Sequence, residues 1–515
     1  MTARLWSVGS IRLRVAVAIA LALTIEGLMR SNLNMAYVCM VSVSHLEPPK
    51  RPTVIHSEEE CPVLTFATDN STRTYKGTLE WSSTDRAYLF PMFYIGGLAM
   101  TTVTEPLDRK LGAARLVLYG AVVNVFGTLA TPWIAVNVGP VVLSVVRFLM
   151  GAGQAVVFPC MSVLVARWFP VEEKSTALAI ATTGNQLSVV LSMIVTAELC
   201  QWESLGGWVS AFYIYGLLGI VFCLLWYALV VDFPSEAKAI SDEELKLLNA
   251  GRKPRSKPKP RWGVLLSSPV VWSICASSFC HNFVVVAFSS YLPFYYKSVH
   301  NMSLTSNGIL CTVPFVLQFV SKVFFASMAD WAKKRRWLSV TAATRISNSC
   351  ASFGIAVSLF VMAYCDCSYR WTAVVAATTA MAFISGYVPG YNTSVVCVAP
   401  SQTAAISSFS RFWAQVGMSL SPSLIGIIVT TGNVEEWRYI FLGTTALCIA
   451  TGIFFQCCGS ASIQPWNNVD EAAAQRDGLS GSRVVVDPNT MDAEKLLLPK
   501  EAPVLGEAPT TQPVA

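Results

Sequence analysis

The chain has 515 residues, of which 53% are hydrophobic and only 13% are charged, whereas an ordinary soluble domain has about 25% charged residues. This composition, with a mean hydropathy of +0.51, excludes an ordinary soluble enzyme, because so much apolar surface needs lipid around it. The formal net charge of +6 is mild, and the basic residues lie in short connections. Nucleic-acid binding is therefore not expected.

The apolar residues gather in long runs. A bilayer core about 30 Å thick needs roughly 20 apolar residues for each helical crossing. Runs of this length, bounded by charged residues, Pro or Gly, lie at 15–43, 87–104, 114–134, 139–165, 176–198, 209–231, 270–296, 307–329, 338–363, 372–398, 403–430 and 438–458. We therefore predict an all-α multi-pass membrane protein with twelve transmembrane helices.

The first run differs from a cleaved signal peptide, although Arg12 and Arg14 precede it. Glu26 and Arg30 interrupt the apolar stretch, which then continues to residue 43 with no clear cleavage site of small residues after it. The run is thus predicted to stay in the protein as a helix.

Lys and Arg in the short loops predict the orientation, because such residues are enriched on the cytoplasmic side. The more basic loops include the linker at 232–262, so this side and both termini are expected in the cytoplasm. The opposite side holds a long first loop at about 44–86. Two glycosylation sequons begin at Asn70 and Asn301 and fall on that side, which agrees with the charge pattern. A third match at Asn392 lies within a span and is attributed to chance.

The linker divides the spans into six and six, and a short motif repeats in the two parts. Asp108 is followed by basic residues after the second span, and Asp330 is followed by basic residues after the eighth. The predicted parts are an N-terminal half at 1–231, a C-terminal half at 263–458 and a disordered tail at 459–515. Two six-helix halves around a central cavity are the plan of major facilitator transporters.

Most of the 15 cysteines lie inside apolar runs, as Cys39 does, where Cys behaves as a small hydrophobic residue. We therefore take them as no indication of a redox compartment. Cys365 and Cys367 form a C-x-C pair in a predicted loop, but no second Cys or His pair at metal spacing accompanies it. No metal and no cofactor are expected.

Several segments resemble one transporter family in its order and spacing. They are residues 30–38, 147–159, 168–174, 206–216, 232–244, 291–296 and 459–466. These segments are similar to the organic-anion transporter family that includes sialin, the vesicular glutamate transporters and the type I sodium-phosphate cotransporters. The resemblance covers about residues 15–466 and implies transport of a small anion.

The resemblance implies that Arg30 and Arg147 face the substrate path and bind the anion. A guanidinium stays charged and presents a planar fork of donors that suits carboxylate or phosphate, and a charge in mid-bilayer is costly unless it serves a purpose. The alternative is that each arginine pairs with a structural acid or extends to the membrane surface. For Arg30 the candidate acid is Glu26, one turn earlier on the same face.

One position departs from the family. Sialin and the glutamate transporters have a glutamate seven residues after the second arginine, where this chain has Gln154. An amide does not take up a proton as a carboxylate does, so this route of proton coupling is in doubt. Glu26 is a candidate replacement, because its protonation would release Arg30 for substrate. A permanent ion pair with Arg30 is the alternative.

Three further residues of the C-terminal half have ionisable side chains inside predicted spans. His281 stands where the glutamate transporters have an arginine; it is a candidate pH-sensing residue or a neutral histidine bonded to a neighbour such as Asn282. Arg411 replaces a small polar residue of the family, and either adds a third positive charge to the cavity or snorkels to the cytoplasmic surface. Lys322 is expected to snorkel.

The tail contains a sequence from Asp492 to Leu496 and Leu497 that is similar to an acidic dileucine sorting signal, which clathrin adaptors bind. It favours a lysosomal or endosomal membrane, with the plasma membrane as second choice.

The predicted function is secondary active transport of a small organic anion, such as an acidic sugar or an amino-acid-like carboxylate, by alternating access and with a co-transported proton. Sodium-linked phosphate transport and potential-driven transport are alternatives, and a non-transporting sensor is the alternative from another class. An enzyme is not expected, because His281 is the only one of four histidines within a span, which leaves no set of catalytic groups in one cavity.

Overall fold

The computed structural model describes residues 10–41, 77–101, 103–169, 174–202, 204, 206–237, 240, 261–400 and 402–467. Most of the long first loop, of the linker and of the tail lies outside these ranges. The helices form one compact unit, Met1–Gln464, and the rest of the chain is a second unit, Pro465–Ala515.

The N-terminal half contains helices α1 to α8. They are α1 (Ile11–Met40), α2 (Ser83–Thr101), α3 (Thr104–Leu111), α4 (Ala113–Asn137), α5 (Pro140–Ala155), α6 (Val157–Trp168), α7 (Lys174–Gln201) and α8 (Trp208–Leu229). α5 and α6 form one crossing. The break between them comes just before Pro159, which has no N–H for a bond to the preceding turn.

The C-terminal half begins after the short turn η3 (Pro234–Glu236) and repeats this plan. It contains α10 (Trp262–Ser267), α11 (Pro269–Ser298), α12 (Leu304–Lys334), α13 (Val340–Met362), η4 (Cys367–Tyr369), α14 (Arg370–Ile384), η5 (Ser385–Tyr387), α15 (Tyr391–Cys397), α16 (Thr403–Ile428) and α17 (Val434–Cys458). α14, η5 and α15 form one crossing with a break beside Pro389 and Gly390. With each broken helix counted once, the described residues form twelve crossings, as the sequence predicts.

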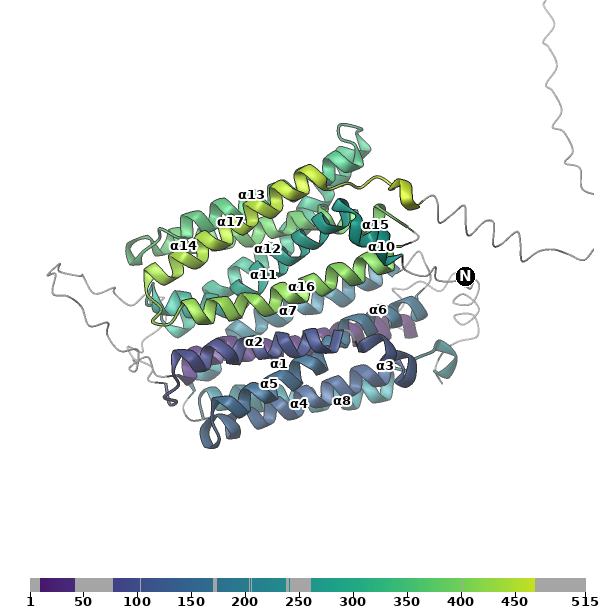
Figure 1. Cartoon of the computed structure of the whole chain (residues 1–515). Coiled ribbons are helices and arrows are strands. Elements are labelled where there is room, and N and C mark those ends of the chain that lie inside the picture. The colour runs from purple at the N-terminus through teal and green to yellow at the C-terminus, as the bar shows by residue number, and fades with distance from the viewer. Residues whose placement is uncertain are drawn as a thin grey trace, which may run out of the picture. The chain divides into compact units, whose positions relative to one another are not determined.

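The two halves lie side by side, with the purple to blue helices of one next to the teal to yellow helices of the other (Figure 1). α2 packs against α16 and α7 against α12 across the boundary, and α1 contacts α11. Among the described residues, nine crossings are apolar enough to be recognised by hydropathy alone. α1, α2 and α16 are not among them, and the sequences of all three contain charged and polar residues.

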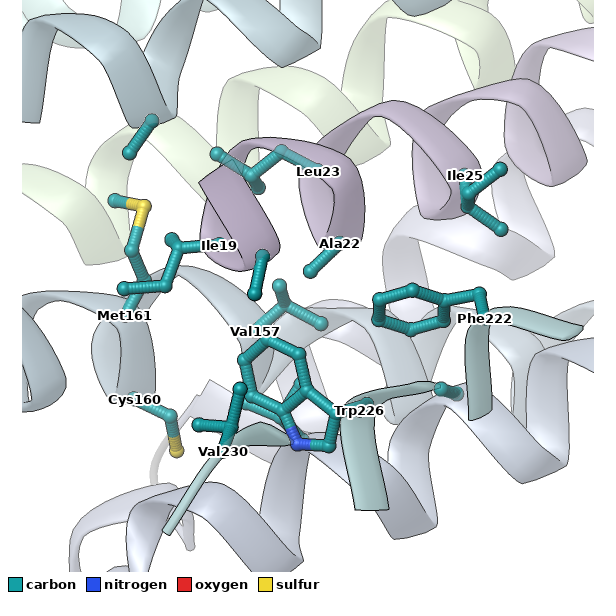
Figure 2. Close-up of a cluster of buried hydrophobic side chains, with 14 of the residues drawn as sticks. Ile19, Ala22, Leu23, Ile25, Val157, Cys160, Met161, Phe222, Trp226 and Val230 are labelled. Carbon is teal, nitrogen blue, oxygen red and sulfur yellow. The ribbon is translucent and has the colours of Figure 1, made fainter. Parts of the chain in front are cut away.

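The core of the N-terminal half is an apolar cluster formed mainly by α1, α4, α6 and α8. Figure 2 shows Ile19 and Ala22 of α1 facing Val157 of α6 and the rings of Phe222 and Trp226 of α8. The indole of Trp226 also donates to the Ala114 carbonyl at 2.9 Å. The apolar face of α1 is therefore fixed against this core, and this packing determines where the other side chains of α1 point.

One end of the bundle carries a disulfide between Cys39 of α1 and Cys200 of α7, and we call it the disulfide end. The interpretation of Cys39 as a small hydrophobic residue is wrong, because α1 and α7 run in the same direction and bring the two thiols together. Cys367 of the C-x-C pair is also disulfide-bonded. Disulfides persist in oxidising compartments, so these cysteines do carry information about the compartment.

The opposite end, where α8 leads into the linker, is called the linker end. Here Arg167 Nη1 and Asp232 Oδ1 form an ion pair at 3.1 Å. The same carboxylate oxygen accepts from the Ala114 N–H at 3.1 Å. In the C-terminal half, Arg345 Nε donates to the Gly459 carbonyl at 2.7 Å. These bonds join helices within one half.

At the disulfide end, the bonds cross from one half to the other. Asn34 Nδ2 donates to the Ser289 carbonyl at 2.9 Å, and Gln201 Nε2 donates to Thr305 Oγ1 at 2.6 Å. Arg86 of α2 donates to the carbonyl that follows α16, at Val429. These contacts close the disulfide end.

Candidate functional site

The two arginines of the sequence motif lie together in the middle of the N-terminal half. Arg30 Nη2 donates to Asn185 Oδ1 on α7 at 3.1 Å. Arg147 Nη2 donates to the backbone carbonyl of Arg30 at 3.3 Å, and its guanidinium carbon lies 4.6 Å from the centre of the Phe93 ring. Arg147 is buried, with 3% of its surface exposed. The structure thus places both residues at one point of the bundle.

Neither arginine forms an ion pair with an acid within the described part of the chain. The contacts of Arg30 and Arg147 in that part are to an amide, a carbonyl and an aromatic ring. A buried cation with uncompensated charge is costly, and an anionic ligand would relieve that cost. Two cations without an ion-pair partner are thus the main electrostatic property of the site.

The two guanidinium groups point in different directions. Side chains tilt toward the N-terminus of their own helix. α1 starts at the linker end and α5 starts at the disulfide end. Arg30 is therefore directed toward the linker end and Arg147 toward the disulfide end, and they meet through the Arg30 carbonyl.

Glu26 lies inside the apolar core of the N-terminal half, with 1% of its surface exposed. Its neighbours Ile25 and Met29 belong to the apolar cluster. Neither carboxylate oxygen has a hydrogen-bond partner, so the bonded ion pair with Arg30 considered from the sequence does not form. Burial of an ionised carboxylate without a partner costs several kcal/mol.

Gln154, the residue in place of the family glutamate, lies on α5 two turns beyond Arg147. Its side-chain oxygen is buried and has no hydrogen-bond partner. The amide therefore neither pairs with an arginine nor compensates its charge through this oxygen.

His281 of α11 is bonded to a different partner from the one considered from the sequence. Its Nδ1 lies 2.9 Å from the hydroxyl of Tyr391, and its ring stacks on Tyr387 with 5.1 Å between centroids. Asn282 instead donates to the Ser278 carbonyl at 2.8 Å. Adjacent residues on a helix point about 100° apart, so the tyrosines of the broken crossing are closer to the imidazole.

Arg411 of α16 packs against the other half of the bundle. Its guanidinium carbon lies 4.0 Å from the centre of the Phe158 ring, on α6 of the other half. The side chain is exposed, although it belongs to a helix at the boundary between the halves.

Lys322 of α12, which is expected to snorkel, contacts α7 of the other half. With its amide oriented so that both polar atoms are satisfied, Gln186 donates to the Thr182 carbonyl at 2.8 Å and accepts from Lys322 Nζ. The sequence signal was a lysine before the end of an apolar run. Its partner lies far away along the chain, so no local pattern identified it.

The predicted glycosylation and sorting positions lie away from the arginine site or outside the described residues. Asn301 lies in the turn between α11 and α12, partly buried between the fully buried His300 and Met302. Asn392 donates to the Tyr387 carbonyl at 3.3 Å. Asn70, Asp492, Leu496 and Leu497 lie outside the described residues. Within the described ranges, His, Cys, Asp and Glu form no group of three or more that suits a metal ion.

Comparison with known proteins identifies the class. Residues 19–347 match the family model described as Major Facilitator Superfamily. The chain is 26% identical to a "Putative inorganic phosphate cotransporter" of Drosophila melanogaster, over 86% of this chain and 84% of that protein. It is 25% identical to "Sialin" of Homo sapiens, over 89% of this chain and 91% of that protein.

Solved structures agree on the fold. A bacterial homologue of the human lysosomal transporter Spinster, solved in an inward-facing and occupied conformation, superimposes with a TM-score of 0.59 and 14% identity, over 87% of this chain and 96% of that chain. The chain belongs to the Major Facilitator Superfamily, and within it to the organic anion and phosphate transporter family. It is a multi-pass membrane transporter and not an enzyme.

Proposed function

We propose that the protein moves a small organic anion, such as an acidic sugar or an amino-acid-like carboxylate, across its membrane together with a proton. The observation that carries this proposal is the contact between Arg30 and Arg147 without an acidic partner in the described part of the chain. Two such cations at one point of the bundle favour an anion, and Arg147 would bind it near the disulfide end of the path.

The disulfide end is assigned to the lumen or exterior and the linker end, with both termini, to the cytoplasm. The Cys39–Cys200 disulfide supports this orientation, as do the basic residues of the linker. A lysosomal or endosomal membrane is the proposed location. The sorting signal for clathrin adaptors is part of this proposal, as is glycosylation at Asn70 and Asn301.

Transport would occur by rocking of residues 1–231 against residues 263–458. The closed disulfide end supports a state in which the site opens toward the linker end. In the opposite state, the bonds from Asn34 to Ser289 and from Gln201 to Thr305 would break. Substrate would then reach Arg147 from the lumen or exterior.

Glu26 is proposed as the proton-binding group. It is buried, its oxygens have no hydrogen-bond partner, and it is close enough to Arg30 for their charges to interact. When it is neutral, Arg30 has no competing anion; when it is ionised, it attracts Arg30 away from substrate. Gln154 has no such function because its amide does not titrate.

The test is uptake of a panel of labelled anions into proteoliposomes. An imposed proton gradient is compared with a membrane potential of equal driving force. Flux that follows the gradient supports proton symport, whereas flux driven by potential or by sodium supports one of the two alternative coupling modes. Saturable binding without flux under any condition contradicts transport and favours a sensor.

Two substitutions assign the roles of the arginine and the acid. Arg147→Gln is expected to lower uptake at least about 100-fold, because it removes a charge-assisted contact in a buried site. The matched control is Arg335→Gln at the linker end, where Arg335 lies over Trp331. Glu26→Gln is expected to abolish the dependence on the proton gradient; transport that keeps its full pH dependence would contradict the role of Glu26.

A further inference from the structure

Lys322 and Arg30 are held by adjacent residues of the same helix. Asn185 of α7 accepts from Arg30 of the N-terminal half, and Gln186 accepts from Lys322 of the C-terminal half. The two cations therefore lie at the same depth in the bundle, on opposite sides of the boundary between the halves. Adjacent side chains on a helix point about 100° apart, which keeps the two charges at separate points.

Arg411 extends this positive region on the C-terminal half. The His281–Tyr391 pair, bonded at 2.9 Å, belongs to the same region. Ser278, one turn before His281 on α11, donates to the carbonyl of Ser410, next to Arg411, at 3.1 Å. Ser321, next to Lys322, lies 2.8 Å from Ser385 in the turn that holds Tyr387, on which His281 stacks. Phe158 of the N-terminal half lies under the Arg411 guanidinium at 4.0 Å. The region is thus built from both halves.

The charges of this region are not compensated by protein groups that the structure describes. Lys322 has an amide oxygen as its partner, and Arg411 has an aromatic ring. A guanidinium carries five N–H donors and an ammonium carries three, so most of these donors remain available to a ligand. Arg411 is exposed, which makes its donors accessible.

We infer that Lys322 and Arg411 form a second anion subsite, on the C-terminal half, that takes the second acidic group of a dianionic substrate whose first acidic group binds at Arg30. The inference rests on the proposed function and specifies its substrate class. Each half then contributes cations to the same ligand, and the ligand neutralises charges that otherwise repel one another across the boundary.

A dianion fits this arrangement better than a monoanion for a physical reason. A single carboxylate at Arg30 leaves the charge of Lys322 uncompensated in a region of low dielectric, where charges interact strongly. A ligand with two acidic groups compensates both, and it also links the two halves. Such a ligand would favour the state in which α7 and α12 lie together.

The experiment measures binding to the purified full-length protein in detergent, from the thermal stabilisation that each ligand produces at constant ionic strength. The ligands are pairs of matched chain length, succinate with butyrate and adipate with hexanoate, and inorganic phosphate is added as a compact anion. The wild type is expected to bind the dicarboxylate of at least one pair more tightly than its monocarboxylate.

Lys322→Gln is expected to weaken dicarboxylate binding about 10- to 100-fold, as loss of a charge-assisted bond does, and to change monocarboxylate binding by less than about 3-fold. Arg411→Gln should act in the same direction. Lys322→Arg keeps the charge and should retain the preference for two acidic groups. Lys333→Gln is the matched control, because Lys333 pairs with Asp330 at 2.7 Å near the linker end.

Gln186→Ala separates a ligand-binding role of Lys322 from a structural one. This variant removes the protein partner of Lys322 and leaves its charge, so it should retain the preference for dicarboxylates. If Gln186→Ala and Lys322→Gln have the same effect, Lys322 holds α7 to α12 and the inference is wrong. The inference is also wrong if the wild type binds no dicarboxylate more tightly than its matched monocarboxylate. A third contradicting result is that phosphate binds and Lys322→Gln does not weaken the binding of any anion. Absence of all anion binding would instead contradict the proposed function itself.

Discussion

The two ends of the helical bundle are held in different ways. At the disulfide end, Asn34, Gln201 and Arg86 bond across the boundary to the C-terminal half. At the linker end, the bonds of Asp232 and Arg345 stay within one half. Contacts between halves must break during rocking, whereas contacts within a half need not. The difference indicates which contacts belong to a gate and which maintain each half.

The largest expected effect is on the ratio of closed to open states, and it comes from placing a bulky side chain between helices at the disulfide end. A Cβ atom on Gly426 of α16 would lie 2.5 Å from the Ala87 Cα on α2, so Gly426→Leu cannot be accommodated without separating the helices. At a cost of about 3 kcal/mol, the ratio of closed to open states falls by more than about 100-fold. The distance between spin labels at Ser82 and Thr430, measured by electron paramagnetic resonance, should increase.

The matched control for this prediction is Gly443→Leu on α17, where a Cβ atom would meet nothing within 4 Å. It should leave the distance and the transport rate unchanged. An unchanged distance in Gly426→Leu would show that the disulfide end is not a gate.

The second effect concerns the pH dependence of stability at the disulfide end. Burial lowers the pKa of His300 from 6.5 to about 4, with a further lowering by the charge of Arg370 and an opposing effect of Asp366. His300 is fully buried beside the Tyr295 ring, with 5.0 Å between centroids. The folded state therefore favours neutral His300, whereas the unfolded chain takes up a proton below its ordinary pKa.

This shift contributes stability that is complete above pH 6.5 and is lost as the pH falls toward 4. The loss is about 3 kcal/mol at most. His300→Gln should remove this dependence, which is measured from the thermal unfolding midpoints of both proteins between pH 7.5 and pH 4.5. Parallel curves for the wild type and the variant over this range would contradict the assignment.

The smallest effect is expected at the linker end, within the N-terminal half. Asp232→Asn weakens the ion pair with Arg167 and the bond from the Ala114 N–H. The carboxylate is largely buried but solvent still screens the pair, so the expected loss of stability is about 1 kcal/mol. The unfolding midpoint should fall, while the spin-label distance at the disulfide end stays the same.

Asp330→Asn is the control, since Asp330 is 63% exposed in its pair with Lys333. Its effect should be within about 0.5 kcal/mol. If Asp232→Asn instead alters the distance at the disulfide end, the two ends are coupled and the separation between gate and scaffold contacts fails.

The helical crossings follow from the sequence with small errors. The predicted spans at 270–296 and 403–430 correspond to α11 (Pro269–Ser298) and α16 (Thr403–Ile428). A membrane helix satisfies its backbone hydrogen bonds internally, so a mainly apolar run bounded by charged residues, Pro or Gly locates it. This holds even for α16, which is not apolar enough to be recognised by hydropathy alone. The same local rule did not reveal the breaks within the crossings at Val156 and near Pro389.

The sequence by itself determined the number of crossings, the division into halves and the two arginines, because these depend on local composition and on motifs. Only the tertiary structure decided the partners of the buried polar groups. The pairing of Cys39 with Cys200, of His281 with Tyr391 and of Lys322 with Gln186 joins helices far apart in the chain. Such pairings depend on how the helices pack, and no spacing along the chain encodes that packing.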